Sequence, residues 1–333
     1  MNSCCENCIK DKVLHSIILK EFEEIGKCNI CQSENVKKIN SDKFIDYFEM
    51  LLEIYHKNED GEELYKLFQD DWGIFLNEQI ACDLVSIVVP YSKNKKYSRK
   101  IETDLVSNLW ESFKEEIKHN NRFFPKFKDF ELEHFKEWLR ELKNENLRKK
   151  FLYRARISDD KQIIPKENMG KPPAKFIKSG GRANPVGISY LYTATNQKTA
   201  IAEVRPHKGE VIAIAKIKIT EKLILADLRN PRLDTSPFAI LNMQINEIYK
   251  YINLLQHFSK ELSKPVIPKE AYLEYLPTQY LSELIKDIGY DGFIFKSSVS
   301  NGDNVVLFSE DKIKIDNIEL YSIDNITFSA KQK

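Results

Sequence analysis

Between about residues 41 and 143, apolar residues recur at intervals of three and four positions. This spacing places side chains on one face of a helix, and such a face normally packs into a protein core. Pro90 and Pro125 interrupt the pattern, because proline ends or kinks a helix. The region is therefore predicted to be a set of amphipathic helices. The apolar positions are Phe44, Tyr47, Phe48, Leu51, Leu52 and Tyr55; Ile101, Leu105, Leu109, Phe113 and Ile117; and Leu132, Phe135, Trp138, Leu139 and Leu142.

Beyond the polar stretch KNENLRKK at 143–150, the pattern changes to short apolar runs that are typical of strands. Helical spacing returns from about 236 to 262, and again from Thr278, a predicted helix cap, to the residue before Gly289. Strands mixed irregularly with helices indicate an α+β fold rather than a doubly wound sheet. The predicted strands are 151–157, 188–193, 211–219, 223–227, 292–295 and 305–308.

These changes predict three segments along the chain: a cysteine-bearing segment at 1–40, a helical domain at 41–147 and a mixed α/β domain at 148–325. The 333 residues are long enough for more than one core, and 42% hydrophobic with 30% charged residues is an ordinary globular balance. The segments are therefore expected to fold rather than to remain disordered.

Lys and Arg number 51 against 50 Asp and Glu, so the net charge of +1 creates no field that attracts nucleic acid or a membrane. The local basic run KNKKYSRK at 93–100 is expected to be a solvated turn before a helix; contact with a phosphate backbone is the alternative. No apolar run approaches the roughly 18 residues of a membrane span, and the first residues lack the apolar region of a signal peptide. We expect a cytoplasmic protein with neither a membrane nor nucleic acid as a partner.

Four of the six cysteines form two pairs with metal-binding spacing. Two residues lie between Cys5 and Cys8, two lie between Cys28 and Cys31, and 19 residues separate the pairs. In a reducing compartment such pairs hold metal more often than they form disulfides. The sequence predicts a structural zinc ion, which would stabilise a segment with too little apolar mass to fold alone. Cys4 remains an alternative ligand to Cys5.

The stretch from residue 179 to 207, SGGRANPVGISYLYTATNQKTAIAEVRPH, has the densest set of chemical groups. Its glycine loop contains Arg182, the predicted strand after it contains Tyr190 and Tyr192, and Asn196 is a plausible cap for a helix that ends near Glu203. A guanidinium binds phosphate, an aromatic ring packs on a base, and a carboxylate stabilises a cationic sugar. Together they predict a nucleotide-sugar substrate; taken singly, each is more often a surface or packing residue.

This stretch, together with FLYRAR at 151–156 and YLPTQYLSELIKDIGYDGFIFKSSV and NVVLF within 275–308, resembles the RES-domain family. The resemblance covers about residues 150–310 and implies a fold similar to the ADP-ribosyltransferases and the degradation of NAD⁺, with several members acting as toxins. By position it implies catalytic roles for Glu203, Arg154 and Tyr192. It implies substrate-binding roles for Arg182, Ser297 or Ser298, Asn304 and Tyr190.

In the roles implied by the resemblance, Arg154 and Arg182 hold the pyrophosphate and Tyr192 lies against nicotinamide or its ribose. Glu203 offsets the charge that develops on the ribose. The chain departs from some members at Ala155, where they have a tyrosine after the first arginine. Ring contact at that point is then expected from Tyr153, from Tyr190 or from no residue.

The helical region also resembles the HEPN-like domain that accompanies some RES domains. HEPN ribonucleases use an Arg followed four to six residues later by a His, and none of the six histidines has such an Arg upstream. The resemblance therefore implies a helical scaffold or sensor without a second nuclease site.

We expect an enzyme that cleaves the nicotinamide N-glycosidic bond of NAD⁺, with water or phosphate as the acceptor, acting as a bacterial toxin or antiphage effector. An antitoxin or regulatory protein and a second copy of the chain are the expected partners. One alternative is transfer of ADP-ribose to a protein or nucleic acid. Another is a zinc-containing nucleic-acid sensor whose catalytic half is degenerate.

Overall fold

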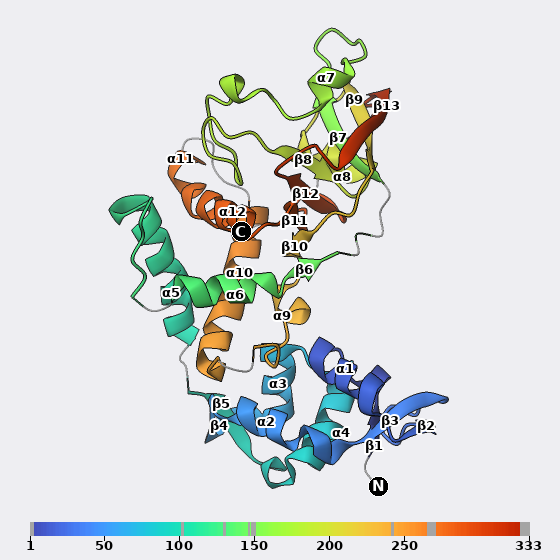
Figure 1. Ribbon diagram of the computed structural model, residues 1–333, viewed down its shortest axis with the longest axis vertical. Helices are drawn as coiled ribbons and strands as arrows, with labels where there is room; N and C mark the ends of the chain where they lie inside the picture. The colour runs from blue at the N-terminus through green and yellow to red at the C-terminus, as the bar shows by residue number, and fades with distance from the viewer. Residues whose placement is uncertain are drawn as a thin grey trace. The chain divides into compact units, whose positions relative to one another are not determined.

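The computed structural model describes residues 3–100, 103–128, 131–145, 147, 151–240, 243–264 and 271–326 (Figure 1). Contacts within the chain divide it into two units, and each unit is assembled from several segments. The first unit comprises Met1–Ser112, Phe127–Glu141 and Asn230–His257. The second comprises Phe113–Lys126, Leu142–Arg229 and Phe258–Lys333.

The first unit begins with a small antiparallel sheet in the order β1-β3-β2. Helix α1, which lies between β1 and β2 in the sequence, contacts β3. Asp11 caps α1 by accepting hydrogen bonds from the backbone amides of Val13 and Leu14, and Leu14 and Ile18 are buried on its inner face. The cysteine-bearing segment is therefore a mixture of strands and a helix. Its elements are β1 (Ser3–Cys5), η1 (Glu6–Cys8), α1 (Lys12–Glu21), β2 (Glu24–Gly26) and β3 (Val36–Asn40).

The rest of the first unit is mainly helical, as predicted, with a core that includes the rings of Phe44, Phe48, Phe68 and Phe75. Its 3₁₀ segments are η2 (Ser41–Phe44) and η3 (Pro90–Ser92). Its helices are α2 (Ile45–Leu52), α3 (Leu64–Trp72), α4 (Glu78–Val88), α6 (Leu132–Arg140), α9 (Pro231–Asp234) and the first parts of α5 (Thr103–Glu115) and α10 (Ile245–Ser263).

A two-stranded antiparallel sheet lies among these helices and corrects the helical prediction. Strand β4 (Tyr55–Glu63) pairs with β5 (Lys96–Arg99), so part of the basic run at 93–100 is a strand rather than a turn. In β4 only Tyr55 is buried, and its eight other residues are polar or glycine, so no apolar alternation marks the strand. Arg99 in β5 forms a 2.7 Å ion pair with the buried Asp71.

The second unit is built on an eight-stranded sheet in the order β13-β9-β7-β8-β12-β11-β10-β6. All neighbouring pairs are antiparallel except β10 and β11. The mixed α/β prediction is therefore confirmed. The strands are β6 (Lys143–Asn144), β7 (Phe151–Ile157), β8 (Leu191–Ala194), β9 (Val211–Ile219), β10 (Leu225–Asp227), β11 (Gly292–Lys296), β12 (Asp303–Leu307) and β13 (Ile313–Ser322).

Alternate residues of these strands form one apolar core. The buried cluster joins Leu152 of β7, Leu191 of β8, Ile217 of β9, Ile294 of β11 and Val305 of β12. Because the side-chain period of a strand is two, the residues between them face the other side of the sheet. Tyr192, which follows Leu191, occupies that second face, whereas Arg154, two positions after Leu152, lies on the face of the apolar cluster. Both residues line the candidate site.

Two helices, α10 and α12 (Leu276–Asp287), begin at other residues than predicted. Helix α10 begins at Ile245 rather than near 236, because Ser236 accepts a hydrogen bond from the amide of Phe238 in a local turn. Helix α12 begins before Thr278, whose hydroxyl oxygen lies 2.9 Å from the carbonyl oxygen of Tyr275 within the first turn. The other elements are π-helix η4 (Glu116–Asn120), α7 (Lys166–Met169), η5 (Ala174–Phe176), α8 (Gln197–Glu203) and α11 (Ala271–Glu274).

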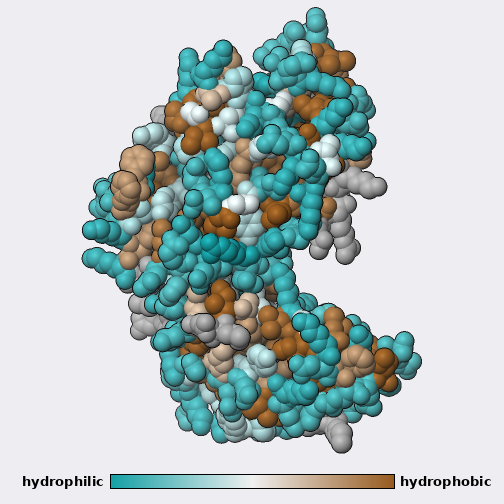
Figure 2. Space-filling model, viewed as in Figure 1, coloured by the Kyte–Doolittle hydropathy of each residue, from teal (hydrophilic) through white to brown (hydrophobic). Residues whose placement is uncertain are grey.

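Hydrophilic residues cover most of the face shown in Figure 2, and hydrophobic residues appear there as separate patches. Among the described helices, none combines the length and the apolar content that crossing a membrane requires.

Candidate functional site

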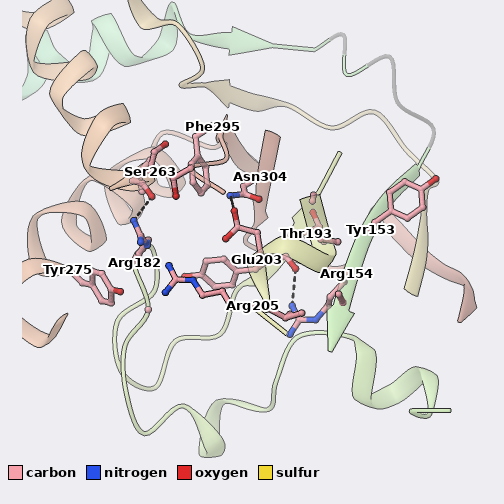
Figure 3. Close-up of a pocket in the computed structure, with 18 of the residues that line it drawn as sticks. Tyr153, Arg154, Arg182, Thr193, Glu203, Arg205, Ser263, Tyr275, Phe295 and Asn304 are labelled. Carbon is pink, nitrogen blue, oxygen red and sulfur yellow. Dashed lines mark hydrogen bonds between the residues drawn. The ribbon is translucent and has the colours of Figure 1, made fainter. Parts of the chain in front are cut away.

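A cavity of about 530 Å³ lies in the second unit (Figure 3). Its walls come from β7, β8, the end of α8, the end of α10, Tyr275 and the loop at 180–182, with Phe295 and Asn304 from neighbouring strands. Its volume is in the range of sites for small organic ligands. Residues that are 150 positions apart in the sequence meet here because β7 and β12 both pair with β8.

Glu203 is held at the end of α8 with one oxygen engaged. Asn196 caps the helix by accepting a 2.8 Å hydrogen bond from the amide of Thr199. At the other end, Glu203 Oε1 accepts hydrogen bonds from Ser297 Oγ at 2.7 Å and from Asn304 Nδ2 at 2.6 Å. Within the described residues, Glu203 Oε2 makes no hydrogen bond, and the side chain is exposed to the cavity. A carboxylate oxygen is thus oriented and open to a ligand.

The two neighbouring serines lie differently. Ser297 contacts Glu203, and its oxygen also accepts from the amide of Val299 at 3.2 Å, whereas Ser298 lines the cavity. The turn that contains them packs tightly on the start of α8, where a Cβ on Gly302 would lie 2.2 Å from Asn196 Nδ2. The close approach explains why glycine occupies this position.

Arg154 projects from β7 into the cavity wall and forms no ion pair with the described residues, although the charge of Glu310 acts on it from beyond ion-pair distance. Its Nη1 donates a 3.1 Å hydrogen bond to the carbonyl of Tyr192, while its buried Nε has no partner there. Burial lowers the pKa of Arg154 to about 10, and the nearby charge of Arg156 adds to the effect. A half-buried cation with an unused, buried Nε is suited to an anionic ligand.

Tyr192 fixes the glycine loop that forms another wall. Its hydroxyl donates to Asn184 Oδ1 at 2.7 Å and accepts from the amide of Ala183 at 3.2 Å. Burial raises the pKa of Tyr192 to about 12, so the hydroxyl stays protonated. A Cβ on Gly181 would lie 2.8 Å from this hydroxyl, which leaves room only for glycine. The ring of Tyr192 lines the cavity while its hydroxyl holds the loop.

Arg182 lines the cavity, and its guanidinium is also hydrogen-bonded to the end of a helix. Its Nη1 donates to the carbonyls of Leu262, at 2.8 Å, and of Lys264, both at the C-terminus of α10. Its guanidinium lies 5.8 Å from the ring centre of Tyr275. Sequence reasoning predicted a phosphate ligand at Arg182, and the capping contacts are an additional role that the sequence does not indicate.

Tyr190, predicted to bind substrate, does not line this cavity. Its side chain is buried, its ring packs on Phe308 at 4.8 Å between centres, and its hydroxyl donates to Glu283. Only Tyr153, of the two tyrosines considered for ring contact beside Ala155, lies in the cavity wall. Tyr190 directly precedes β8, which begins at Leu191, so the alternation that would place it beside Tyr192 does not extend to it.

Sequence reasoning missed several lining residues, of which Arg205 is the most informative. It lies two residues after the end of α8, its φ of 48° lies in the left-handed region, and its side chain is exposed at the cavity. An arginine rarely adopts this conformation without a local constraint. The motif that identified Glu203 includes Arg205 two positions later, and this neighbourhood was the available indication. The other missed residues are Thr193, Ser263, Tyr275 and Phe295.

The four paired cysteines meet in the first unit. Sγ atoms of Cys5, Cys8, Cys28 and Cys31 all lie within 4.8 Å of one another, and neighbouring sulfurs are 3.4 to 3.8 Å apart. Zinc–sulfur bonds of about 2.3 Å in a tetrahedron place sulfurs about 3.8 Å apart, so these residues fit a four-thiolate metal site. Hydrogen bonds from the neighbouring thiols lower the pKa of Cys28.

Cys4 is outside this cluster. It is buried, and burial raises its pKa to about 12. The choice left open between Cys4 and Cys5 is therefore decided in favour of Cys5 by geometry.

Comparison with known proteins gives one family. The family model described as "RES domain" matches residues 152–324, just over half of the chain. No curated protein matches. Among solved structures, a chain of the M. tuberculosis MbcT–MbcA toxin–antitoxin complex matches with a TM-score of 0.34 and 11% identity, covering 57% of this chain and 93% of that chain. At that TM-score the likeness carries no conclusion about the present chain.

Proposed function

This chain belongs to the RES-domain family, and we propose that its cavity binds NAD⁺ and cleaves the bond between nicotinamide and ribose. The observation that supports this most strongly is the pairing of opposite charges in one cavity. Glu203 presents an oriented carboxylate oxygen, and Arg154 presents a cation without a counter-ion among the described residues. NAD⁺ has a group that matches each side chain. Its anionic pyrophosphate matches Arg154, and its ribose, which becomes cationic as the bond breaks, matches Glu203.

In this proposal Arg154 and the exposed Arg205 face the pyrophosphate, and Arg182 contributes positive charge from the end of α10. Tyr192 keeps the loop at 181–184 in place through its hydroxyl. Ser297 and Asn304 are positioning residues, because they act through Glu203 Oε1. Ser298 lines the wall and is available to a polar group of the substrate.

The reaction needs one carboxylate. As the bond from ribose C1′ to the ring nitrogen breaks, its electron pair stays with nitrogen, and nicotinamide leaves as a neutral molecule without an acid. The positive charge moves to the ribose, where Glu203 Oε2 accepts a hydrogen bond from a ribose hydroxyl and stabilises it. Water or phosphate then adds at C1′, and the products distinguish the two.

The test compares Glu203→Gln with Glu221→Gln, an exposed glutamate outside the cavity. Glu203→Gln keeps the size of the side chain and should lower NAD⁺ turnover by on the order of a hundredfold, the scale of losing one preorganised electrostatic group. Glu221→Gln should match the wild type. Equal rates for both variants, at equal melting temperatures, would exclude Glu203 as the catalytic carboxylate.

We also propose that Cys5, Cys8, Cys28 and Cys31 hold one structural zinc ion. The sulfur distances and the burial of Cys5, Cys8 and Cys28 support it. The ion would stabilise the small sheet without taking part in the reaction. Elemental analysis of freshly prepared, reduced protein should find one zinc per chain, and a value well below one would reject the proposal.

We propose a separate role for each of the three predicted segments. The domain at 148–325 performs catalysis, the segment at 1–40 binds zinc, and the domain at 41–147 is a helical scaffold or sensor. Consumption of NAD⁺ would arrest growth, so a toxin role with an antitoxin or regulatory partner is part of the proposal. Expression in bacteria should arrest growth with the wild type and not with Glu203→Gln. Arrest by both variants at similar protein levels would contradict a toxin that acts through NAD⁺.

A further inference from the structure

A second cavity, of about 520 Å³, lies in the same unit and borders the first. Gly180 and Tyr275 line both cavities, so one wall is shared. Arg182 lies at this wall, with its guanidinium 5.8 Å from the ring centre of Tyr275. A ligand that spans both cavities would pass beside a cation and an aromatic ring.

The lining of the second cavity is rich in aromatic and apolar side chains. The rings of Phe123 and Tyr272 are 81% and 67% exposed, which is unusual for side chains of this size beside a cavity. Tyr275 and Tyr280 supply further rings, and Ile188 adds an aliphatic side chain from the glycine loop. Aromatic faces of this kind bind flat heterocycles by stacking.

Few polar groups face this cavity, and most are already engaged. Glu283 accepts the hydroxyl of Tyr190, and Arg122 donates to the carbonyl of Ile117 at 3.5 Å. Gln279 is the exception: its Nε2 donates to the carbonyl of Gly181 at 2.8 Å, while its Oε1 makes no hydrogen bond within the described residues. An acceptor beside stacked rings matches a heterocycle with an amino group on its edge.

We propose that the second cavity binds the adenosine monophosphate half of the dinucleotide whose nicotinamide half occupies the first. This inference rests on the proposed function. Glu203 marks the ribose that reacts, and Arg182 lies at the wall shared with the second cavity, where the pyrophosphate would cross. The adenine ring stacks on Phe123 and Tyr272, and its amino group donates to Gln279 Oε1.

The walls of this subsite are tied together in ways that favour a preformed site. Lys118 of η4 forms a 2.6 Å ion pair with Glu274 of α11, which joins the segment before Phe123 to the helix that contains Tyr272. The hydroxyl of Thr278 donates to the carbonyl of Arg182 at 2.6 Å, which fixes the glycine loop on α12. A preformed site loses less conformational freedom on binding.

The test uses binding of AMP, which lacks the nicotinamide half and reports on the second cavity without catalysis. Phe123→Ala and Tyr272→Ala change exposed side chains, so little effect on folding is expected. Phe124→Ala is the matched control, because Phe124 is also 81% exposed but does not line the cavity. Tyr272→Phe keeps the ring.

We expect AMP to bind the wild type, Tyr272→Phe and Phe124→Ala alike, and to bind Phe123→Ala and Tyr272→Ala roughly tenfold more weakly, the lower part of the range for losing one stacking contact. The KM for NAD⁺ should rise by a similar factor in the same two variants. Unchanged AMP affinity in both, or no AMP binding to the wild type at millimolar concentration, would overturn the inference.

The outcome is separable from that of the proposed function. If the wild type consumes NAD⁺ while all variants bind AMP equally, the reaction stands and the subsite is wrong. If AMP binding depends on Phe123 and Tyr272 but NAD⁺ is not consumed, the subsite stands and the reaction is wrong. A cavity that captures an apolar peptide and ignores AMP would likewise overturn the inference.

Discussion

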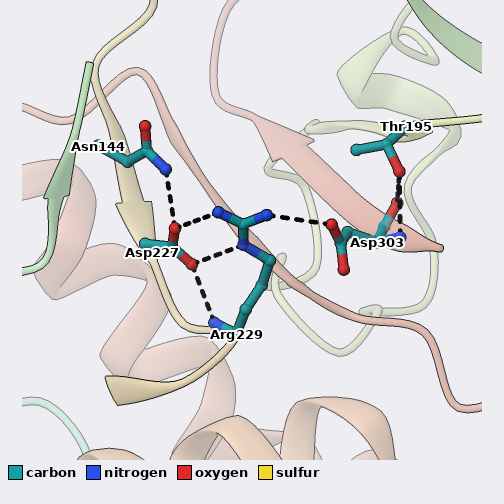
Figure 4. Close-up of polar contacts among 5 residues, drawn as sticks. All are labelled: Asn144, Thr195, Asp227, Arg229 and Asp303. Atoms are coloured by element: carbon teal, nitrogen blue, oxygen red, sulfur yellow. Dashed lines mark hydrogen bonds and ion pairs between the residues drawn. The ribbon is translucent and has the colours of Figure 1, made fainter. Parts of the chain in front are cut away.

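Two arginines on the same sheet have opposite surroundings. Arg229, just after β10, donates from Nε and Nη2 to the buried Asp227 and lies 3.3 Å from Asp303 on the next-but-one strand (Figure 4). Asn144 donates to the same Asp227 at 2.8 Å. Within the part of the chain that the structure describes, Arg154 has a single hydrogen bond, to a carbonyl, and an unused buried Nε.

The two environments shift the pKa of their arginines in opposite directions. Hydrogen bonds that Arg229 donates to Asp227 outweigh burial and raise the pKa of Arg229, whereas burial, with no carboxylate in hydrogen-bond contact, lowers the pKa of Arg154 to about 10. A buried charge is costly unless it is paired. The charge of Arg229 is therefore paired within the fold, whereas the charge of Arg154 is paired only when an anionic ligand is present.

The largest expected effect is on stability, from Arg229→Met. Removing Arg229 leaves Asp227, whose side chain is 6% exposed, without its main partner. Breaking a buried pair in this way should lower the free energy of unfolding by about 3 kcal/mol. Denaturant titration measures the change. A loss below about 0.5 kcal/mol would mean that the network contributes nothing to folding.

The same variant sharpens the comparison through its pH dependence. Burial alone would raise the pKa of Asp227, but hydrogen bonds from Arg229 and Asn144 lower it below its usual value. A depressed carboxyl pKa stabilises the fold above the unfolded value of about 4, and that contribution is lost as the pH falls through the folded pKa. The wild type should lose stability over that acidic range, and Arg229→Met should show a flatter profile.

The next effect is on activity, from Arg154→Met. Loss of the unpaired cation should reduce kcat/KM for NAD⁺ about a hundredfold, which corresponds to about 2.7 kcal/mol. Stability should be unchanged or slightly higher, because a costly buried charge is replaced by an apolar chain. A variant that is destabilised as much as Arg229→Met would show that Arg154 has a structural partner, and the contrast between the two arginines would fail.

The smallest effect is expected from Asp303→Asn. Its pair with Arg229 is 3.3 Å long, and both side chains are partly exposed, at 25% and 33%. Such pairs contribute about 0 to 1 kcal/mol. Asp303 also precedes Asn304, which holds Glu203, but its backbone bonds to Thr195 do not depend on the carboxylate. Less than a threefold change in NAD⁺ turnover is expected, and a large one would link the two networks.

Parts of this fold could be predicted from local pattern alone. Strands β7 and β9 have the predicted bounds, because each is a clear run of strand-forming residues: Phe151, Tyr153, Ala155 and Ile157 alternate in β7, and β9 begins with five consecutive apolar residues. The helix cap at Asn196 was also predicted correctly, because a cap depends only on residues within the first turn of α8. Strand β13 was missed, since a register shift between Ile315 and Asn317 breaks its alternation.

Contacts between distant segments could not be predicted. Arg182 caps a helix end about 80 residues away, and no local pattern encodes that contact. The bonds that join Glu203 to Ser297 and Asn304 depend on the pairing of β8, β11 and β12, so only the residue types could be inferred from motifs. The open Nε of Arg154 is a property of the packed sheet.

The most direct test of the central claim is the mass balance of NAD⁺ incubated with the purified chain, with and without phosphate. The cavity that joins Glu203 to an unpaired Arg154 predicts one nicotinamide released for each NAD⁺ lost, with ADP-ribose or its phosphorylated form as the other product. NAD⁺ recovered intact, or nicotinamide released equally by Glu203→Gln, would contradict the claim.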